Sequence, residues 1–198
     1  LPVDTRLNRH ILIFGASGTM KSRAVIRPYL IQSVKRQESV IVTDSKSELY
    51  NDMAGYLIDN GYAVKVFNLV DPRHSDSWNC MADLQQDTLL AQVLSDVIIS
   101  NTSGDRGDHF WDNGEANLLK ALVLYVDHST AFGADRRNLP EVYRFLTQTN
   151  ERQLSALFDK LPMEHPARAP YSLFRQSSDT VRSGILLGLG TRLQTLQS

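Results

Sequence analysis

The chain has 198 residues, a formal net charge of −1 and a single cysteine, Cys80. This length can bury one substantial core or two small ones, whereas a lone cysteine excludes an internal disulfide and a cysteine-rich metal site. A net charge near zero gives no overall reason to expect nucleic acid or an acidic membrane as a partner. No apolar run approaches the roughly 18 to 20 residues that span a bilayer.

From residue 10 to about 70, short apolar runs alternate with longer amphipathic stretches, which is typical of a parallel sheet flanked by helices. The pattern predicts strands at residues 10–15, 39–44 and 64–69, and helices at residues 21–36 and 47–60. Pro28 should kink or shorten the first helix, and Gly61 is the expected C-cap of the second. This half of the chain is therefore predicted to be α/β.

The segment HILIFGASGTMKS, residues 10–22, joins the first expected strand to the first expected helix. A strand followed by a glycine-bearing loop and a helix that starts with Lys-Ser is typical of a phosphate-binding loop. We expect the loop amides to wrap nucleotide phosphates, Lys21 to contact the β and γ phosphates and Ser22 to ligate Mg²⁺. The predicted site comprises Gly15, Ala16, Ser17, Gly18, Thr19, Met20, Lys21 and Ser22.

Met20 departs from the usual pattern GxxxxGK[ST], because it stands where the second glycine is expected. Loop amides that curl around phosphates adopt conformations that a side chain makes costly, by roughly 1 to 3 kcal/mol. Two interpretations are open at this point. The loop binds a nucleotide weakly or with the help of a partner, or it is an ordinary strand-to-helix turn.

An acid follows the second expected strand at Asp44, where a carboxylate could lie near the nucleotide. Asp44 could equally cap the following helix. A second apolar run ends in acid at Asp127, but its spacing continues a helical pattern, so Asp127 is predicted to be a helix-end residue. No residue is assigned a catalytic role.

After Val70 the sequence becomes polar and turn-forming, and no strand pattern follows. Helices are expected at residues 83–100, 111–130, 139–149, 151–160 and 177–196, with LPMEHPARAP as a linker. The second of these carries one apolar face, made of Leu118, Leu119, Leu122, Tyr125 and Val126. It starts at DHFWDNGE, whose acids Asp108, Asp112 and Glu115 favour a helix N-terminus and whose Trp111 is a buried anchor or a binding residue.

Several segments together resemble the conjugative type IV secretion coupling proteins, membrane-anchored ATPases that bring DNA with its bound relaxase to a secretion channel. The resemblance rests on residues 10–22 and on five later segments. These are VIVTDSKSEL from residue 40, YAVKVFNLVDP from residue 62, SWN from residue 77, FWDNGEANLLKALVLYV from residue 110 and SGILLGLGTRL from residue 183. These segments span most of the chain in the family's order.

The resemblance implies a partial RecA-like P-loop nucleotide-binding domain over residues 1–75 and an inserted all-α domain over residues 76–198. Further strands of the ATPase core would come later in the protein. The glycines of the loop, with Lys21 and Ser22, take the family's ATP-binding places. Asp44 begins DSKSE, which matches a family motif often written DPKGE, with serine in place of its proline and its glycine.

The implied cofactors are ATP and Mg²⁺, and the implied partners are relaxase or relaxosome proteins, DNA and the type IV secretion channel. The full-length protein would be a homohexamer at the cytoplasmic face of the bacterial membrane, and this chain by itself is not expected to hydrolyse ATP well. Two other functions are open. One is a P-loop nucleotide kinase or switch, and the other is a substrate-docking module in which Met20 impairs nucleotide binding.

Overall fold

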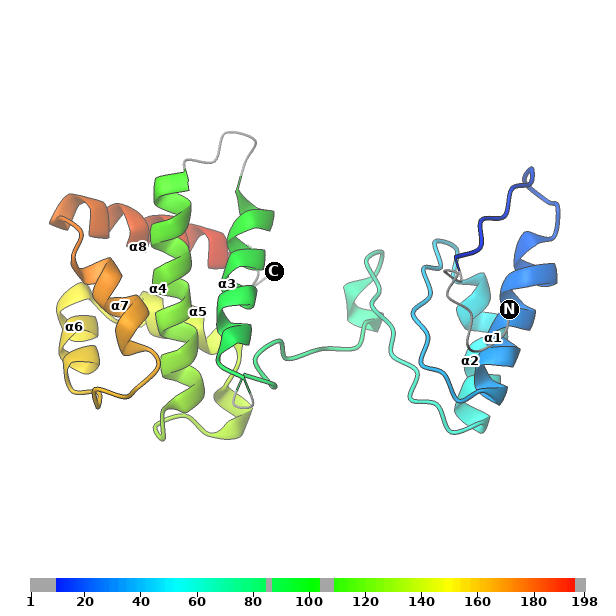
Figure 1. Ribbon diagram of the computed structural model, residues 1–198, viewed down its shortest axis with the longest axis horizontal. Coiled ribbons are helices and arrows are strands. Elements are labelled where there is room, and N and C mark those ends of the chain that lie inside the picture. The colour runs from blue at the N-terminus through cyan, green and yellow to red at the C-terminus, as the bar shows by residue number, and fades with distance from the viewer. Residues whose placement is uncertain (1–9, 85–86, 104–108, 195–198) are drawn as a thin grey trace. The chain divides into compact units, whose positions relative to one another are not determined.

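The structure, a computed structural model, describes residues 10–84, 87–103 and 109–194. The chain divides into two compact units, with the division between Ser77 and Trp78 (Figure 1). We call the part up to Ser77 unit 1 and the part from Trp78 unit 2.

Unit 1 is built from two helices and long connecting segments. Its elements are the π-helical turn η1 (Ser22–Ile26), α1 (Arg27–Lys35), α2 (Glu48–Asp59) and the 3₁₀ turn η2 (Pro72–His74). An ion pair between Arg27 and Asp52 joins α1 to α2. The Tyr62 hydroxyl donates to the carbonyl oxygen of Glu38 at 3.1 Å, which ties the chain after α2 to the end of α1.

Pro28 explains the irregular start of the first helix. Proline has no N–H to donate to the carbonyl of residue 24, so the regular ladder is interrupted there. The Arg27 N–H instead bonds to the Ser22 carbonyl, five residues back. At the end of α2, Gly61 is left-handed with φ of 83°, and the Tyr62 N–H reaches the Leu57 carbonyl at 3.0 Å.

The prediction of an α/β, RecA-like domain is wrong for this structure, because the described residues of the chain contain helices and no strand. The segments 10–15, 39–44 and 64–69 run as irregular chain, and Phe14 is 85% exposed. Apolar and β-branched runs favour an extended backbone, but a sheet forms only where such segments pair edge to edge. The backbone bond from Asp76 N to Val66 O, at 2.7 Å, joins the third segment to a polar turn instead.

Unit 2 is a helical bundle around one central helix (Figure 1). Its elements are α3 (Leu89–Thr102), α4 (His109–His128), η3 (Ala134–Arg136), α5 (Leu139–Gln148), α6 (Glu151–Asp159), α7 (Arg168–Arg175) and α8 (Asp179–Gln194). α4 packs against α3, α5, α7 and α8. Ala121, Val123 and Leu124 are therefore as buried as the predicted apolar face, and α4 is covered on all sides over residues 121–127.

The sequence did not predict α7, because Pro166 and Pro170 marked its segment as a linker. Pro170 lies in the first turn of α7, where the missing N–H would have no partner within the helix. Tyr171 and Phe174 then face the core, and the Tyr171 ring stacks on Phe158 with centroids 3.9 Å apart. The sequence did contain a signal for this helix, namely the two aromatic residues Tyr171 and Phe174, three positions apart and directly after Pro170.

Candidate phosphate-binding loop

The loop between residues 15 and 22 is tightly curled. Gly18 and Met20 both have positive φ, 81° and 61° respectively. The Thr19 hydroxyl donates to the Ala16 carbonyl at 2.8 Å, which closes the turn. The Ala24 N–H bonds to the Met20 carbonyl at 2.7 Å, so the helix begins immediately after the curl. The first N–H groups of this helix have no acceptor within it.

The Lys21 side chain folds back over the loop. Its Nζ donates to the carbonyl oxygens of Gly15 at 2.6 Å and Ala16 at 2.7 Å. Gly15 is required for this arrangement, because a Cβ there would lie 2.6 Å from the Thr19 hydroxyl and 3.3 Å from Cδ of Lys21. The ammonium group therefore concentrates positive charge on the loop at the start of a helix, which favours an anion.

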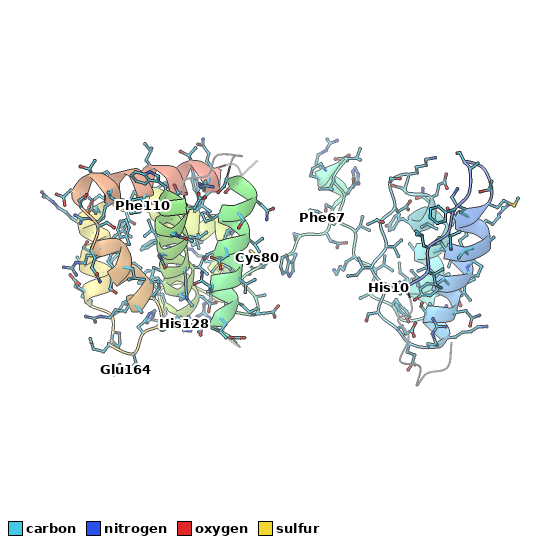
Figure 2. The ribbon with its side chains drawn as sticks, turned by 45° about the horizontal axis from the view of Figure 1, so that its top comes forward. His10, Phe67, Cys80, Phe110, His128 and Glu164 are labelled. Carbon is cyan, nitrogen blue, oxygen red and sulfur yellow. The ribbon has the colours of Figure 1, made fainter. Side chains whose placement is uncertain are left out.

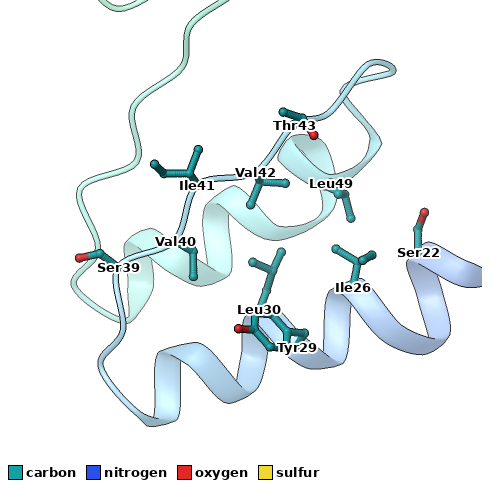
Figure 3. A pocket seen from close by; sticks show the side chains of 10 residues that line it. All are labelled: Ser22, Ile26, Tyr29, Leu30, Ser39, Val40, Ile41, Val42, Thr43 and Leu49. Atoms are coloured by element: carbon teal, nitrogen blue, oxygen red, sulfur yellow. The ribbon is translucent and has the colours of Figure 1, made fainter. Parts of the chain in front are cut away.

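Ser22 lies at the edge of a cavity of about 540 Å³ in unit 1 (Figure 3). The cavity is lined by Ser22, Ile26, Tyr29, Leu30, Ser39, Val40, Ile41, Val42, Thr43 and Leu49. The second expected strand and the helix after the loop thus face the same space, even though they form no sheet. In the part of the chain that the structure describes, the Ser22 hydroxyl makes no hydrogen bond and is available to a ligand.

Asp44 caps α2. Its Oδ2 accepts a hydrogen bond from the Tyr50 N–H at 2.9 Å, in the first turn of that helix. The residue before α2, Ser47, is left-handed with φ of 58°. A role for Asp44 at a nucleotide stays a prediction.

Residues 10–84, 87–103 and 109–194 contain no group of three or more His, Cys, Asp or Glu side chains arranged to hold a metal ion. Among the helices that the structure describes, none has the length and apolar character to cross a membrane.

Comparison with protein families matches residues 4–197 to the family of type IV secretory system conjugative DNA transfer. The chain belongs to this family. The resemblance noted in the sequence is thereby confirmed at the level of conjugative DNA transfer through a type IV secretion system. Searches of curated proteins and of solved structures found no match.

A partly buried ionic cluster in unit 2 of this conjugative DNA-transfer protein was not predicted. Arg192 of α8 donates to Oδ1 of Asp112 at 2.6 Å and to the Ser103 hydroxyl at 2.9 Å, and it also pairs with Glu115. Burial raises the pKa of Glu115, while Arg192 acts against that rise. Arg192 is separated from Asp112 by 80 positions in the sequence, so no local spacing of residues could predict the contact.

Proposed function

We propose that residues Gly15–Ser22 bind the phosphates of ATP with Mg²⁺, and that the chain is part of a coupling ATPase for conjugative transfer. Family membership supplies the DNA-transfer setting. One observation carries the ATP proposal. The Lys21 ammonium donates to the carbonyl oxygens of Gly15 and Ala16, and the curled loop that contains them leads directly into a helix. An ammonium, free helix amides and a hydroxyl are the groups that a triphosphate requires.

On binding, the Lys21 ammonium would exchange the two carbonyls for phosphate oxygens. The amides at the start of the helix would donate to the same anion, and the Ser22 hydroxyl would ligate Mg²⁺. The metal supplies charge neutralisation at the phosphates, and the chain's own groups orient them. Met20 weakens this site through its backbone conformation and not by filling the loop, since its side chain is 62% exposed.

In the intact protein, ATP would drive the recruitment of relaxase or relaxosome proteins with their DNA to the secretion channel. We propose that this protein acts as a homohexamer at the cytoplasmic face of the membrane. The support for this part of the proposal is the family assignment.

Calorimetric titration with ATP and Mg²⁺ tests the site. The parent chain should bind weakly, and Met20→Gly should bind more tightly by roughly fivefold, because glycine avoids the cost of about 1 kcal/mol that a Cβ adds when the loop amides turn toward the phosphates. Lys21→Ala should abolish measurable binding, whereas Lys35→Ala, an exposed lysine at the end of α1, should not change it.

Each alternative function has its own outcome. Absence of binding by both the parent chain and Met20→Gly would contradict the proposal and favour a docking module. Equal affinities for AMP and ATP would show that the β and γ phosphates are not recognised. Phosphoryl transfer to a small acceptor would favour a nucleotide kinase.

A further inference from the structure

Two histidines meet at one end of unit 2. His128 is the last residue of α4, and His165 lies in the turn between α6 and α7. Their rings are arranged edge to face, with centroids 5.8 Å apart and an interplanar angle of 68°. Glu164, the residue before His165, lies at the same end of the bundle as His128 (Figure 2). The contact therefore joins the end of the central helix to the turn that leads into α7.

His165 holds this turn through a hydrogen bond that only an unprotonated Nδ1 can accept. The Ala167 N–H donates to Nδ1 of His165 at 3.2 Å. Ala167 is fully buried and directly precedes α7, so water does not reach its N–H in the folded chain. A protonated imidazole carries a hydrogen on both nitrogens and accepts no hydrogen bond. Protonation of His165 would therefore leave a buried donor without its acceptor, which is costly.

His128 adds a second cost to the protonation of His165. Nδ1 of His128 lies 3.2 Å from the carbonyl oxygen of Leu124 and 3.3 Å from Oδ2 of Asp127, so the neutral ring carries its proton on Nδ1. The carboxylate of Asp127 favours a positive charge on His128. Two positively charged rings at this separation repel each other. A charged His128 therefore opposes a charge on His165.

The other charged side chains on the segments that meet here do not neutralise His165. They are Asp127 of α4, Arg137 after η3, Glu164 in the turn and Arg168 of α7. Asp127 interacts with His128 and Arg137, and Arg168 donates to a backbone carbonyl oxygen. Glu164 is exposed to solvent. In the part of the chain that the structure describes, the charged group that acts on His165 is His128, and it acts against protonation.

We propose that His128 and His165 form a pH-sensitive latch that holds the turn before α7 on the end of α4. The latch is closed while His165 is neutral and opens when His165 takes up a proton. Burial lowers the pKa of His165, and His128 adds to the decrease, so folding favours the neutral ring. Its stabilising contribution is complete above pH 6.5, the ordinary pKa, and is lost as pH falls through the lowered pKa.

Hydrogen–deuterium exchange of the full chain, measured by mass spectrometry from about pH 7.5 to about pH 5.5, tests the latch. Rates are corrected for the intrinsic pH dependence of exchange. Protection of residues 163–169 should fall by up to roughly tenfold per pH unit below 6.5, because uptake of one proton drives the opening. Protonation of Asp127 cannot cause this loss, since a carboxyl with a raised pKa stabilises the fold as pH falls.

Two variants separate the latch from other effects of pH. His165→Asn keeps a side-chain acceptor next to the backbone and does not titrate, so the loss of protection below pH 6.5 should disappear. His74→Asn removes an exposed histidine of unit 1 and should behave like the parent chain.

Constant protection of residues 163–169 in the parent chain over this pH range would overturn the inference. An equal loss in His165→Asn and the parent chain would do the same. If His165→Asn does not fold, His128→Asn takes its place. This variant removes the opposing charge and should reduce the loss, so an undiminished loss would contradict the latch.

Discussion

Two residues adopt left-handed backbone conformations at positions where the motif patterns used in the sequence analysis have glycine. Met20 has φ of 61° at the second glycine of the phosphate-loop pattern, and Ser47 has φ of 58° at the glycine of DPKGE. Left-handed backbone costs a residue with a Cβ roughly 1 kcal/mol or more, which glycine avoids. Both residues therefore hold a backbone conformation that glycine reaches without this cost, and each adds local strain to its turn.

Asp127, at the end of α4, provides a pH prediction. Its side chain is buried, and burial raises the pKa of the carboxyl, while His128 and Arg137 partly oppose the rise. A raised pKa in the folded state means that folding favours the protonated carboxyl of Asp127. The protonated carboxyl therefore contributes its full stabilisation below pH 3.8, the ordinary pKa, and this stabilisation is lost as pH rises through the raised pKa. Asp127→Asn should remove that loss.

Urea unfolding of the parent chain and Asp127→Asn, from pH 3.5 to 7, measures this effect. The stability of the variant relative to the parent should increase with pH over this range. Asp83→Asn, which removes an exposed carboxylate from the same unit, controls for the change in net charge. A difference that stays constant or decreases with pH would show that the buried carboxyl does not titrate as proposed.

At the scale of elements, α4 and α8 cross closely because glycines lie at their contact. A Cβ at Gly114 would come within 2.6 Å of Ile185 Cδ1, and one at Gly184 within 2.7 Å of the Trp111 ring. A Cβ at Gly188 would overlap Oε1 of Glu115. Because Glu115 is held by Arg192, its carboxylate is not free to move aside. The close crossing and the ionic cluster therefore depend on each other.

Two alanine substitutions on α8 distinguish the effect of this contact on stability from the effect of helix propensity. Gly188→Ala should destabilise the protein by about 2 kcal/mol, because the new methyl group displaces a buried, paired carboxylate. Gly190→Ala meets nothing within 4 Å and should stabilise it by about 1 kcal/mol, since alanine favours a helix interior. Thermal unfolding followed by circular dichroism measures both changes. Equal changes in the two variants would contradict the proposed contact.

At the scale of the whole molecule, the apolar core is unevenly divided. In the part of unit 1 that the structure describes, the buried apolar side chains are Leu30, Val34 and Met53, whereas a continuous cluster from Met81 to Leu193 fills unit 2. Large apolar side chains of unit 1, such as Phe14 and Phe67, remain exposed. Because burial supplies most of the stabilising free energy, unit 1 should be much the less stable unit.

Limited trypsin digestion followed by mass spectrometry should reveal this difference. Cleavage should occur first in unit 1 at Lys46, Lys65 and Arg73, and a fragment that contains α3 to α8 should persist. Arg182 and Arg192 are mostly buried in ion pairs and should be cut last. Simultaneous loss of both units would contradict independent stability.

The sequence by itself determined what is local: the helices around residues 21–36, 47–60 and 111–130, the C-terminal cap at Gly61, the curled loop before Lys21 and the family. These features follow from side-chain spacing and φ preferences within a few residues. Only the tertiary structure decided that the three apolar segments form no sheet, that residues 121–127 of α4 are covered on every side and that Arg192 reaches Asp112. Strand pairing, the number of covered helix faces and buried ion pairs each depend on partners far away in the chain, which local patterns do not specify.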